Sequence, residues 1–300
     1  MAAYVNPIEL DGASSNQIRR DGYLKLAGLF TPDAVEGFRA LLASQLRQLE
    51  DRGKDPLVKH AGGGEFAGYS NNVDLRGDVV KGIRESAELR RLCAQLDDGR
   101  WLLTQGLGFE ISSAQKGLGW HWGFRSFCFT GVEDQGYTLW IPLDEVDPEK
   151  QNGGLPVVSE SIYSGREETK MLAAYCHGQE DTTLLMAAAQ NFAGWSSLRN
   201  AVLDKHMVEH AYQPGDALLF SRFVFHKSAP FLEGPQKRRR AFVMRLIPAS
   251  ATFNPQLFAE ATSLFTKFNM HTHEDPVGLR LTDLKAGDPL GNSQFLARLY

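Results

Sequence analysis

The sequence predicts an α+β fold that is mainly β, a jelly roll or sandwich buttressed by helices, on three observations. Amphipathic helical patterns occur mainly in the first hundred residues. From residue 101 onward, short runs rich in β-branched and aromatic residues alternate with Gly, Pro and Asp turns. Hydrophobic residues make up 43% of the 300 residues and charged residues 23%, so a substantial core can form. Helices followed by many short strands favour two packed sheets with a helical layer.

The first expected elements are a strand and two helices. Residues 21–30 alternate and then become apolar, which predicts a strand. Residues 31–50 predict an amphipathic helix, in which Thr31 can cap the N-terminus and Pro32 suits the first helical position. The apolar residues at helical spacing are Val35, Phe38, Leu42, Leu46 and Leu49. Residues 85–96 predict a second helix.

Six later runs predict strands. They cover residues 101–111, 124–131, 137–143, 155–161, 216–222 and 240–248. Residues 166–205 contain Ala, Leu and Met runs and are expected to form a helical or loop-like insertion over an active site. No repeat or linker divides the chain, so we expect a single domain over residues 1–300, with this insertion as its candidate lid.

Composition argues against several classes of partner. The net charge is −4 and the pI is near 6.1, so no basic excess favours a nucleic acid polymer or a membrane surface. The chain has neither a signal-peptide-like start nor a run of about 18 apolar residues, and a cytoplasmic protein is expected. Cys93, Cys128 and Cys176 lack paired spacing and are expected to be free or buried thiols.

Two of the eight histidines stand beside β-like runs. His121 begins one run, within GWHWGFRSF, and His226 ends another, after the turn and strand of PGDALLF. The basic residues 237–240 belong to a neighbouring expected strand, where a cation suits an anionic carboxylate ligand. His206 and His210 have a spacing that can hold zinc on a helix, but the residues between them do not give His-Glu-x-x-His.

Three longer blocks surround these histidines. They read DGYLKLAGLFTPDAVEGFRALL, YTLWIPLDEVDPEKQNGGLPVVSES, and PGDALLFSRFVFHKSAP followed by RRRAFVMRLIP. In order and spacing they resemble the phytanoyl-CoA dioxygenase-type branch of the Fe(II)/2-oxoglutarate-dependent oxygenases, over most of residues 20–250. The resemblance implies a double-stranded β-helix, a cupin-like jelly roll. The chain departs from the family pattern after the middle block, where SESIYSG replaces the usual PGSH.

The resemblance implies roles for particular residues. His121 and His226 would bind Fe(II), and Arg239 would pair with the distal carboxylate of 2-oxoglutarate, although Arg238 and Arg240 are alternatives. Ser228 would donate a hydrogen bond to the same carboxylate, and Trp140 would pack against 2-oxoglutarate. For Ser228 and Trp140, turn capping and ordinary core packing are equally good explanations.

Gly123 stands where the family's metal-binding strand normally carries the carboxylate of His-x-Asp. Two histidines and a carboxylate usually hold Fe(II) and leave three positions, two for 2-oxoglutarate and one for O₂. Without that carboxylate, chloride or bromide could fill the open halide site and balance the charge. Iron/2-oxoglutarate halogenases have Gly or Ala here, so the resemblance implies a halogenase that acts on an unactivated carbon.

Three alternatives stay open for Gly123. Another carboxylate could complete the metal site, from Glu110, Glu133, Asp134 or Asp144. The glycine could mark a non-catalytic, ligand-binding homologue. It could also support hydroxylation or desaturation, with water beside the iron.

The sequence says least about the substrate. We expect a free small molecule, such as a nucleotide or an amino-acid-like metabolite, since no docking surface for a carrier protein is recognisable. Arg125 and Arg222 could bind its phosphate or carboxylate, and so could the basic residues 237–240. A solvated strand end explains residues 237–240 equally well. Trp122 and Phe124 could stack on a planar ring or simply fill the barrel.

Overall fold

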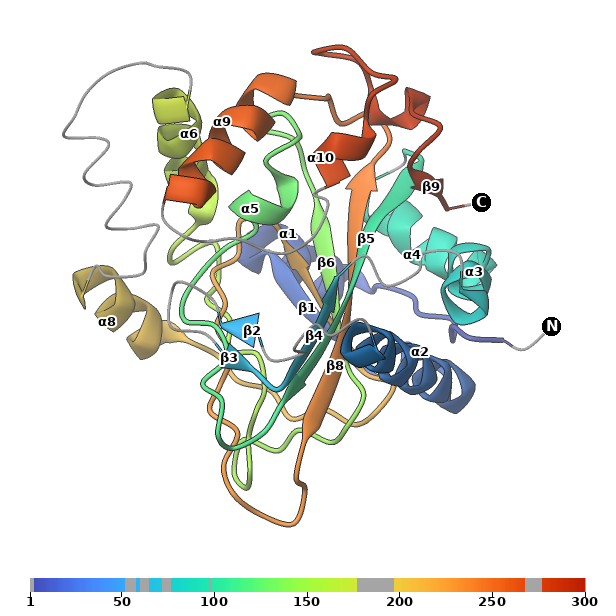
Figure 1. Ribbon diagram of the computed structural model, residues 1–300, viewed down its shortest axis with the longest axis vertical. Helices are drawn as coiled ribbons and strands as arrows, with labels where there is room; N and C mark the ends of the chain where they lie inside the picture. The colour runs from blue at the N-terminus through green and yellow to red at the C-terminus, as the bar shows by residue number, and fades with distance from the viewer. Residues whose placement is uncertain are drawn as a thin grey trace.

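A computed structural model describes residues 3–51, 58–59, 65–71, 77–97, 99–176, 197–267 and 277–299. Its centre is a seven-stranded antiparallel sheet in the order β1-β7-β6-β8-β5-β4, with β9 paired to β5 (Figure 1). The strands are β1 (Tyr23–Leu26), β4 (Gly68–Asn71), β5 (Trp101–Ile111), β6 (Tyr137–Pro142), β7 (Ala217–Ser221), β8 (Arg239–Pro248) and β9 (Ala297–Arg298). A separate pair joins β2 (Val58–Lys59) to β3 (Glu65–Phe66).

The central sheet has one face covered by helices and one inner face. Helices α2 (Pro32–Asp51), α3 (Asp78–Arg84) and α4 (Ala87–Leu96) lie together against the first face (Figure 1). There, the rings of Phe38 from α2 and Phe242 from β8 stack at 4.5 Å. Because side chains alternate along a strand, Arg239, Ala241, Val243 and Arg245 of β8 point to the opposite, inner face.

The remaining helices lie around the edges of the sheet. They are α1 (Gly12–Asp21), α5 (Phe124–Phe127), α6 (Gly165–Cys176), α8 (Ser197–His206), α9 (Pro255–Lys267), α10 (Val277–Arg280) and the 3₁₀ helix η1 (Leu290–Asn292). In Figure 1, α6 and α9 lie side by side at one end of the molecule, and they are in contact. Their apolar side chains share a core cluster with Trp122, Phe127 and Phe225.

The second layer of the fold is less regular than the first. Isolated antiparallel bridges link His121 to His226, His226 to Val157, and Val157 to Val208. These segments therefore run side by side without forming long strands. Together with the main sheet they give the mainly antiparallel, helix-buttressed jelly roll that the sequence predicts.

Several expected elements occur where the sequence places them. The helices predicted at 31–50 and 85–96 correspond to α2 and α4, and Ser86 caps α4 by accepting from the backbone N–H of Glu88. The expected insertion at 166–205 includes α6 and α8, while residues 177–196 lie outside the described residues. The expected free, buried thiols are confirmed, since all three cysteines are unpaired and buried.

Two expected strands are wrong. Residues 124–131 begin with helix α5, in which the backbone N–H of Phe127 donates to the carbonyl oxygen of Gly123. The helical turn buries both Phe124 and Phe127 in one apolar cluster, which an alternating strand would separate. Residues 155–161 take part only in isolated bridges, through Val157.

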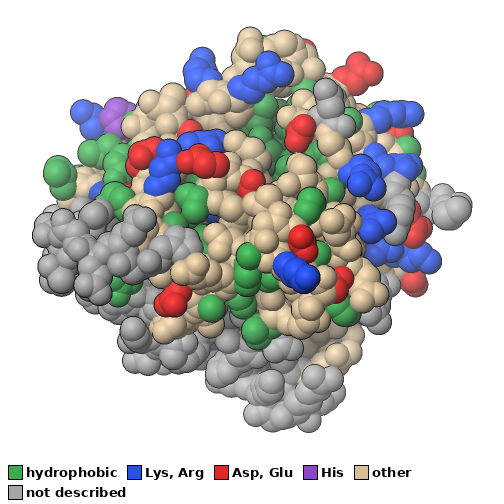
Figure 2. All heavy atoms as spheres, turned by 90° about the horizontal axis from the view of Figure 1, so that it is seen from above, with side chains coloured by type: hydrophobic (Ala, Val, Ile, Leu, Met, Phe, Trp, Pro, Cys, Tyr) green, Lys and Arg blue, Asp and Glu red, His purple; other side chains and the backbone are tan. Residues whose placement is uncertain are grey.

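The described surface agrees with the mixed charge of the sequence. On the face drawn in Figure 2, Lys and Arg side chains are interspersed with Asp and Glu side chains among polar and apolar atoms. None of the helices in the described ranges combines the length and apolar character needed to cross a bilayer.

Candidate active site

His121 and His226 lie directly opposite each other in the second layer. The backbone N–H of His121 donates to the carbonyl oxygen of His226 at 2.9 Å, and the reverse bond measures 2.8 Å. Residues opposite each other in antiparallel pairing present their side chains to the same face. The two imidazole centroids are accordingly 4.1 Å apart, with the rings inclined by 53°. The predicted metal-binding pair is thus brought together.

Backbone carbonyls determine which ring nitrogen of each histidine can bind a metal. Nδ1 of His121 lies 2.8 Å from the carbonyl oxygen of Gly119, and Nδ1 of His226 lies 3.0 Å from that of Val224. Because a carbonyl oxygen can only accept, each Nδ1 carries the proton and each Nε2 offers a lone pair. Contacts of this kind orient the imidazoles of metal sites.

Both imidazoles are held in the neutral form. Burial lowers the pKa of His121 to about 4, and the nearby guanidinium groups of Arg245 and Arg125 act in the same direction. Burial, followed by the neighbouring His121 and then Arg245, lowers the pKa of His226 well below its ordinary value. Since neutral imidazole is the metal-binding form, neither residue has to lose a proton at neutral pH.

In the described ranges, no carboxylate joins the two histidines in a cluster of three metal-binding side chains. The four acidic candidates, Glu110, Glu133, Asp134 and Asp144, have other partners. Glu110 pairs with Arg238, and Glu133 pairs with Lys170. Asp134 accepts from the backbone N–H groups of Gly131 and Thr252, and Asp144 pairs with Arg240. These contacts do not favour any of the four as a replacement ligand.

Gly123 lies where two backbone segments approach closely. Its N–H donates to the carbonyl oxygen of Arg222 at 2.8 Å. A Cβ atom at position 123 would lie 2.8 Å from that oxygen and 3.0 Å from the Cα of Arg222. The φ of −72° suits any residue, so packing is what requires glycine. The backbone of Arg222 therefore takes up the volume of a side chain at this position, in contrast to the extra space expected there.

Hydrogen bonds connect helix α6 to both segments that carry the histidines. The indole Nε1 of Trp122, next to His121, donates to Thr169 Oγ1 at 2.9 Å. Thr169 Oγ1 in turn donates to the carbonyl oxygen of Gly165 at 2.7 Å, and the Gly165 N–H donates to the carbonyl oxygen of Phe223 at 2.8 Å. Phe223 precedes His226 by three positions, so this chain of hydrogen bonds couples both segments to one helix.

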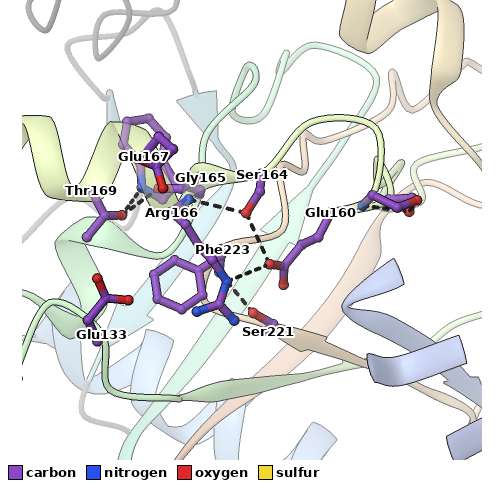
Figure 3. A network of polar contacts seen from close by, with 12 residues as sticks. Glu133, Glu160, Ser164, Gly165, Arg166, Glu167, Thr169, Ser221 and Phe223 are labelled. Atoms are coloured by element: carbon purple, nitrogen blue, oxygen red, sulfur yellow. Dashed lines mark hydrogen bonds and ion pairs between the residues drawn. The ribbon is translucent and has the colours of Figure 1, made fainter. Parts of the chain in front are cut away.

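The same end of α6 is held by a polar network on its outer side (Figure 3). The Arg166 guanidinium lies 4.1 Å from the centroid of the Phe223 ring. Its Nε donates to Glu160 at 3.3 Å, and the Ser164 hydroxyl donates to the same carboxylate oxygen at 3.1 Å. A cation over an aromatic face and a shared carboxylate both restrict where α6 begins.

Arg239 is buried on the inner face at the start of β8. Only 2% of its surface is accessible, and its Nε is buried with no hydrogen-bond acceptor among the described residues. Its guanidinium carbon lies 5.5 Å from the ring centroid of Trp140 on β6. Burial lowers its pKa to about 10, which leaves it charged at neutral pH. A buried, charged donor of this kind suits an anionic carboxylate.

The neighbouring arginines already have carboxylate partners. Arg238 forms an ion pair with Glu110, and Arg240 donates from Nη2 and Nε to Asp144 at 2.6 and 3.0 Å. Strand alternation turns Arg240 to the opposite face from Arg239. Of the three candidates, Arg239 alone lacks a carboxylate partner in the described part of the chain.

The other predicted site residues have structural contacts. Ser228 Oγ accepts from the backbone N–H of Leu118 at 3.1 Å, which is the turn-capping contact considered above. Trp122 and Phe124 are buried in the apolar cluster beneath α6 and α9. Arg222 is 1% exposed, and its Nη1 donates to Thr130 Oγ1 at 2.6 Å. Arg125, on α5, is half-buried and close enough to His121 to affect its pKa.

The family is decided by sequence comparison. The chain matches the family described as Phytanoyl-CoA dioxygenase (PhyH) over residues 18–240. The chain belongs to the PhyH family. The matched range includes His121, His226 and Arg239. A search of curated proteins found no match.

Solved structures with a similar fold include non-heme α-ketoglutarate-dependent enzymes of different reactions. The carbocyclase SnoK from nogalamycin biosynthesis is 15% identical, with a TM-score of 0.63 over 98% of this chain and 100% of SnoK. The epimerase SnoN from nogalamycin biosynthesis is 16% identical, with a TM-score of 0.58 over 97% of this chain and 100% of SnoN. EctD from S. alaskensis, solved with bound Fe, is 18% identical, with a TM-score of 0.53 over 85% and 84%.

PhyH membership places the chain in the Fe(II)/2-oxoglutarate oxygenase superfamily. The described residues fit both Fe(II) and 2-oxoglutarate. In His121 and His226, the backbone carbonyl oxygens of Gly119 and Val224 bond to Nδ1, so Nε2 is the nitrogen that can bind the metal. The buried, unpartnered Nε of Arg239 suits a carboxylate. Sequence reasoning missed Thr169, which accepts the hydrogen bond from the Trp122 indole beside His121.

Proposed function

We propose that this PhyH-family protein is an Fe(II)/2-oxoglutarate-dependent halogenase that places chloride or bromide on an unactivated carbon of a free small molecule. The observation that carries the proposal is the pair of neutral histidines without a clustered carboxylate in the described ranges. An anion from solution would then supply the negative charge that Asp usually contributes. Gly123 supports this reading, since it carries no ligand atom.

The chain's own residues would position the reactants. His121 and His226 present Nε2 to the metal, held by carbonyl oxygens at Nδ1. Arg239 pairs with the distal carboxylate of 2-oxoglutarate, with Trp140 beside it and Ser228 near the distal histidine. Apolar side chains around His226, such as Phe220 at 4.6 Å, exclude water from this end of the barrel.

The cofactors would supply the oxidation when bound. Held by His121, His226 and Arg239, Fe(II) and 2-oxoglutarate would supply with O₂ the oxidation of R–H, a halide ion and a proton to R–halide, with succinate, CO₂ and water as the other products. The choice between halide and hydroxyl is then a matter of which anion the protein holds beside the metal. A nucleotide or amino-acid-like metabolite fits the basic interior as substrate.

The packing at Gly123 favours a second candidate, a hydroxylase or desaturase with the same cofactors. A glycine needed for the close approach of Arg222 does not by itself indicate a halide. A non-catalytic ligand-binding homologue is less well supported, because the neutral histidines and the unpartnered Arg239 are suited to metal and carboxylate binding.

The two candidates differ in halide dependence. Anaerobic addition of Fe(II) and 2-oxoglutarate is expected to give a weak visible charge-transfer band, which a His226→Ala variant lacks. Chloride or bromide should shift this band, and on admission of O₂ should alter the rate of succinate formation. A band and a succinate rate that are both independent of halide would favour the hydroxylase or desaturase. No band at all would favour the non-catalytic homologue.

A further inference from the structure

Trp120 and Lys227 form the residue pair next to the two histidines. His121 lies opposite His226 in antiparallel pairing, so Trp120, one position earlier, falls opposite Lys227, one position later. Lys227 Nζ lies 4.7 Å from the centroid of the Trp120 ring, in keeping with this register. Because side chains alternate along paired segments, Trp120 and Lys227 point away from the face that carries the imidazoles.

One carboxylate oxygen accepts hydrogen bonds from both of these side chains. Asp204 lies near the C-terminal end of α8, and its Oδ1 accepts from Trp120 Nε1 at 2.9 Å and from Lys227 Nζ at 2.5 Å. The ion pair with Lys227 contributes little by itself, because 53% of the Asp204 side chain is exposed. The bond from the indole matters more, since Trp120 is only 6% exposed and donates to a charged acceptor.

The contact between Asp204 and Trp120 bears directly on the orientation of His121. The carbonyl oxygen that lies 2.8 Å from His121 Nδ1 belongs to Gly119, in the peptide group that joins Gly119 to Trp120. A shift of Trp120 would rotate this peptide group and turn the imidazole with it. Carbonyl contacts of this kind set the direction in which Nε2 points at a metal.

The opposite end of α8 is anchored, so Asp204 is presented from a fixed support. Arg199 Nη1 forms an ion pair with Glu168 on α6 at 3.2 Å, with 2% and 8% of the two side chains exposed. The Arg199 guanidinium carbon also lies 5.2 Å from the ring centroid of Phe225, which directly precedes His226. Buried polar contacts of this kind make the helix rigid and restrict displacement of Asp204.

We propose that Asp204 is a positioning residue for the metal site, which fixes the separation and tilt of the His121 and His226 imidazoles from behind. It acts through Trp120 and Lys227, on the face opposite the imidazoles, and not as a metal ligand. The role rests on the proposed metal site and adds the residue that holds its two segments in register.

The Mn(II) affinity of the full chain, measured by calorimetry without turnover, tests this role. Asp204→Ala removes both hydrogen bonds and should weaken Mn(II) binding about tenfold, as is usual when a partner outside the ligand set is lost. Asp204→Asn keeps an oxygen acceptor for both donors and should bind Mn(II) nearly as wild type does. Asp283→Ala is the matched control, because Asp283 is an exposed aspartate that accepts from Ser293 Oγ and the Gln294 N–H in the C-terminal segment. It should keep wild-type Mn(II) affinity even if its melting temperature falls.

A spectroscopic readout distinguishes positioning from general destabilisation. With saturating Fe(II) and 2-oxoglutarate under anaerobic conditions, the charge-transfer band of Asp204→Ala should shift in wavelength, because the band depends on how the ligands surround the metal. The bands of Asp204→Asn and Asp283→Ala should match that of wild type. If Asp204→Ala does not fold, Trp120→Phe keeps an aromatic ring but removes the indole N–H, and should weaken Mn(II) affinity several-fold. Wild-type Mn(II) affinity and an unshifted band in whichever of these two variants folds would overturn the proposal.

The same titrations separate this role from the function on which it rests. A wild-type protein that does not bind Mn(II), or that binds it as tightly after His226→Ala, contradicts the proposed metal site and with it the role of Asp204. Mn(II) binding that requires His226 but is unchanged in Asp204→Ala contradicts only the role assigned to Asp204.

Discussion

The imidazoles of His121 and His226 face each other at 4.1 Å because their backbones exchange two hydrogen bonds. This pairing places the proposed metal site in the second layer, where it depends on two segments and not on a single loop. Nδ1 of each ring is fixed by a carbonyl oxygen two positions earlier, so the ring orientation depends on the local backbone of each segment. Metal binding should therefore require both segments to be folded.

Replacing one histidine should abolish metal-dependent stabilisation. Mn(II) or Fe(II) added anaerobically should raise the melting temperature of wild type. At a free metal concentration a hundredfold above Kd, the gain in the free energy of unfolding should be about 2.7 kcal/mol. His226→Ala should show no such rise, because one imidazole offers too few ligands. His206→Ala, at the exposed end of α8, is the matched control and should retain it. Equal stabilisation of wild type and His226→Ala would place the metal elsewhere.

Arg239→Gln should weaken 2-oxoglutarate binding about ten- to a hundredfold, since a charged hydrogen bond contributes about 1.5–3 kcal/mol. Titration of the charge-transfer band with 2-oxoglutarate measures this loss. Metal affinity in the absence of 2-oxoglutarate should be unchanged. Arg238→Gln, which loses a charge already paired with Glu110, should bind 2-oxoglutarate as wild type does. A larger effect in Arg238→Gln than in Arg239→Gln would reverse the assignment.

Gly123→Ala should destabilise the fold by about 1–3 kcal/mol, because the added Cβ meets the Arg222 backbone. Denaturant unfolding measures the change. Gly119→Ala is the control, since a Cβ at position 119 has no heavy atom within 4 Å. Gly123→Asp should be at least as destabilised as Gly123→Ala. A Gly123→Asp protein with wild-type stability and tighter metal binding would show that the strands separate to admit a carboxylate.

Thr169→Val should remove the hydrogen bond that the Trp122 indole N–H donates to Thr169, at a cost of about 1–3 kcal/mol. Because the hydrogen bond from Trp122 to Thr169 positions the segment that carries His121, the same variant should also bind metal more weakly. Thr169→Ser keeps the hydroxyl and should restore both properties. Chemical unfolding and metal titration of the two variants provide the comparison. Normal metal affinity in a destabilised Thr169→Val protein would limit α6 to a structural role.

The cysteines should be almost inert to alkylation in the native protein. Burial raises the pKa of Cys93 and Cys128 to about 12 and that of Cys176 to about 11. At pH 8 a thiol with a pKa of 12 is about one part in ten thousand thiolate, the reactive form. Mass spectrometry after iodoacetamide treatment should find three adducts in urea and none in buffer. Rapid native labelling of any one would show that its segment opens.

Local patterns in the sequence were sufficient to predict much of the fold. Helix α2 follows from its cap and its periodic apolar residues, and strand β8 follows from the short run rich in β-branched and aromatic residues at 240–248. The histidine pair follows from turn chemistry together with family resemblance. The family resemblance already favoured Arg239 over Arg238 and Arg240, and the carboxylate partners of these two neighbours, Glu110 and Asp144, are consistent with that choice.

Contacts between distant segments could not be predicted in this way. The packing of Gly123 against Arg222 depends on how two loops cross, and no local pattern encodes that distance. The strand expected at 124–131 became helical because burying Phe124 and Phe127 together outweighs their β propensity.

Diffraction from crystals grown anaerobically with Fe(II), 2-oxoglutarate and bromide tests the central claim most directly. Anomalous data collected at the iron and bromine edges would locate the two atoms independently. Iron is expected between the Nε2 atoms of His121 and His226, with bromide next to it. An aspartate or glutamate bound to the iron, with no bromide nearby, would contradict it.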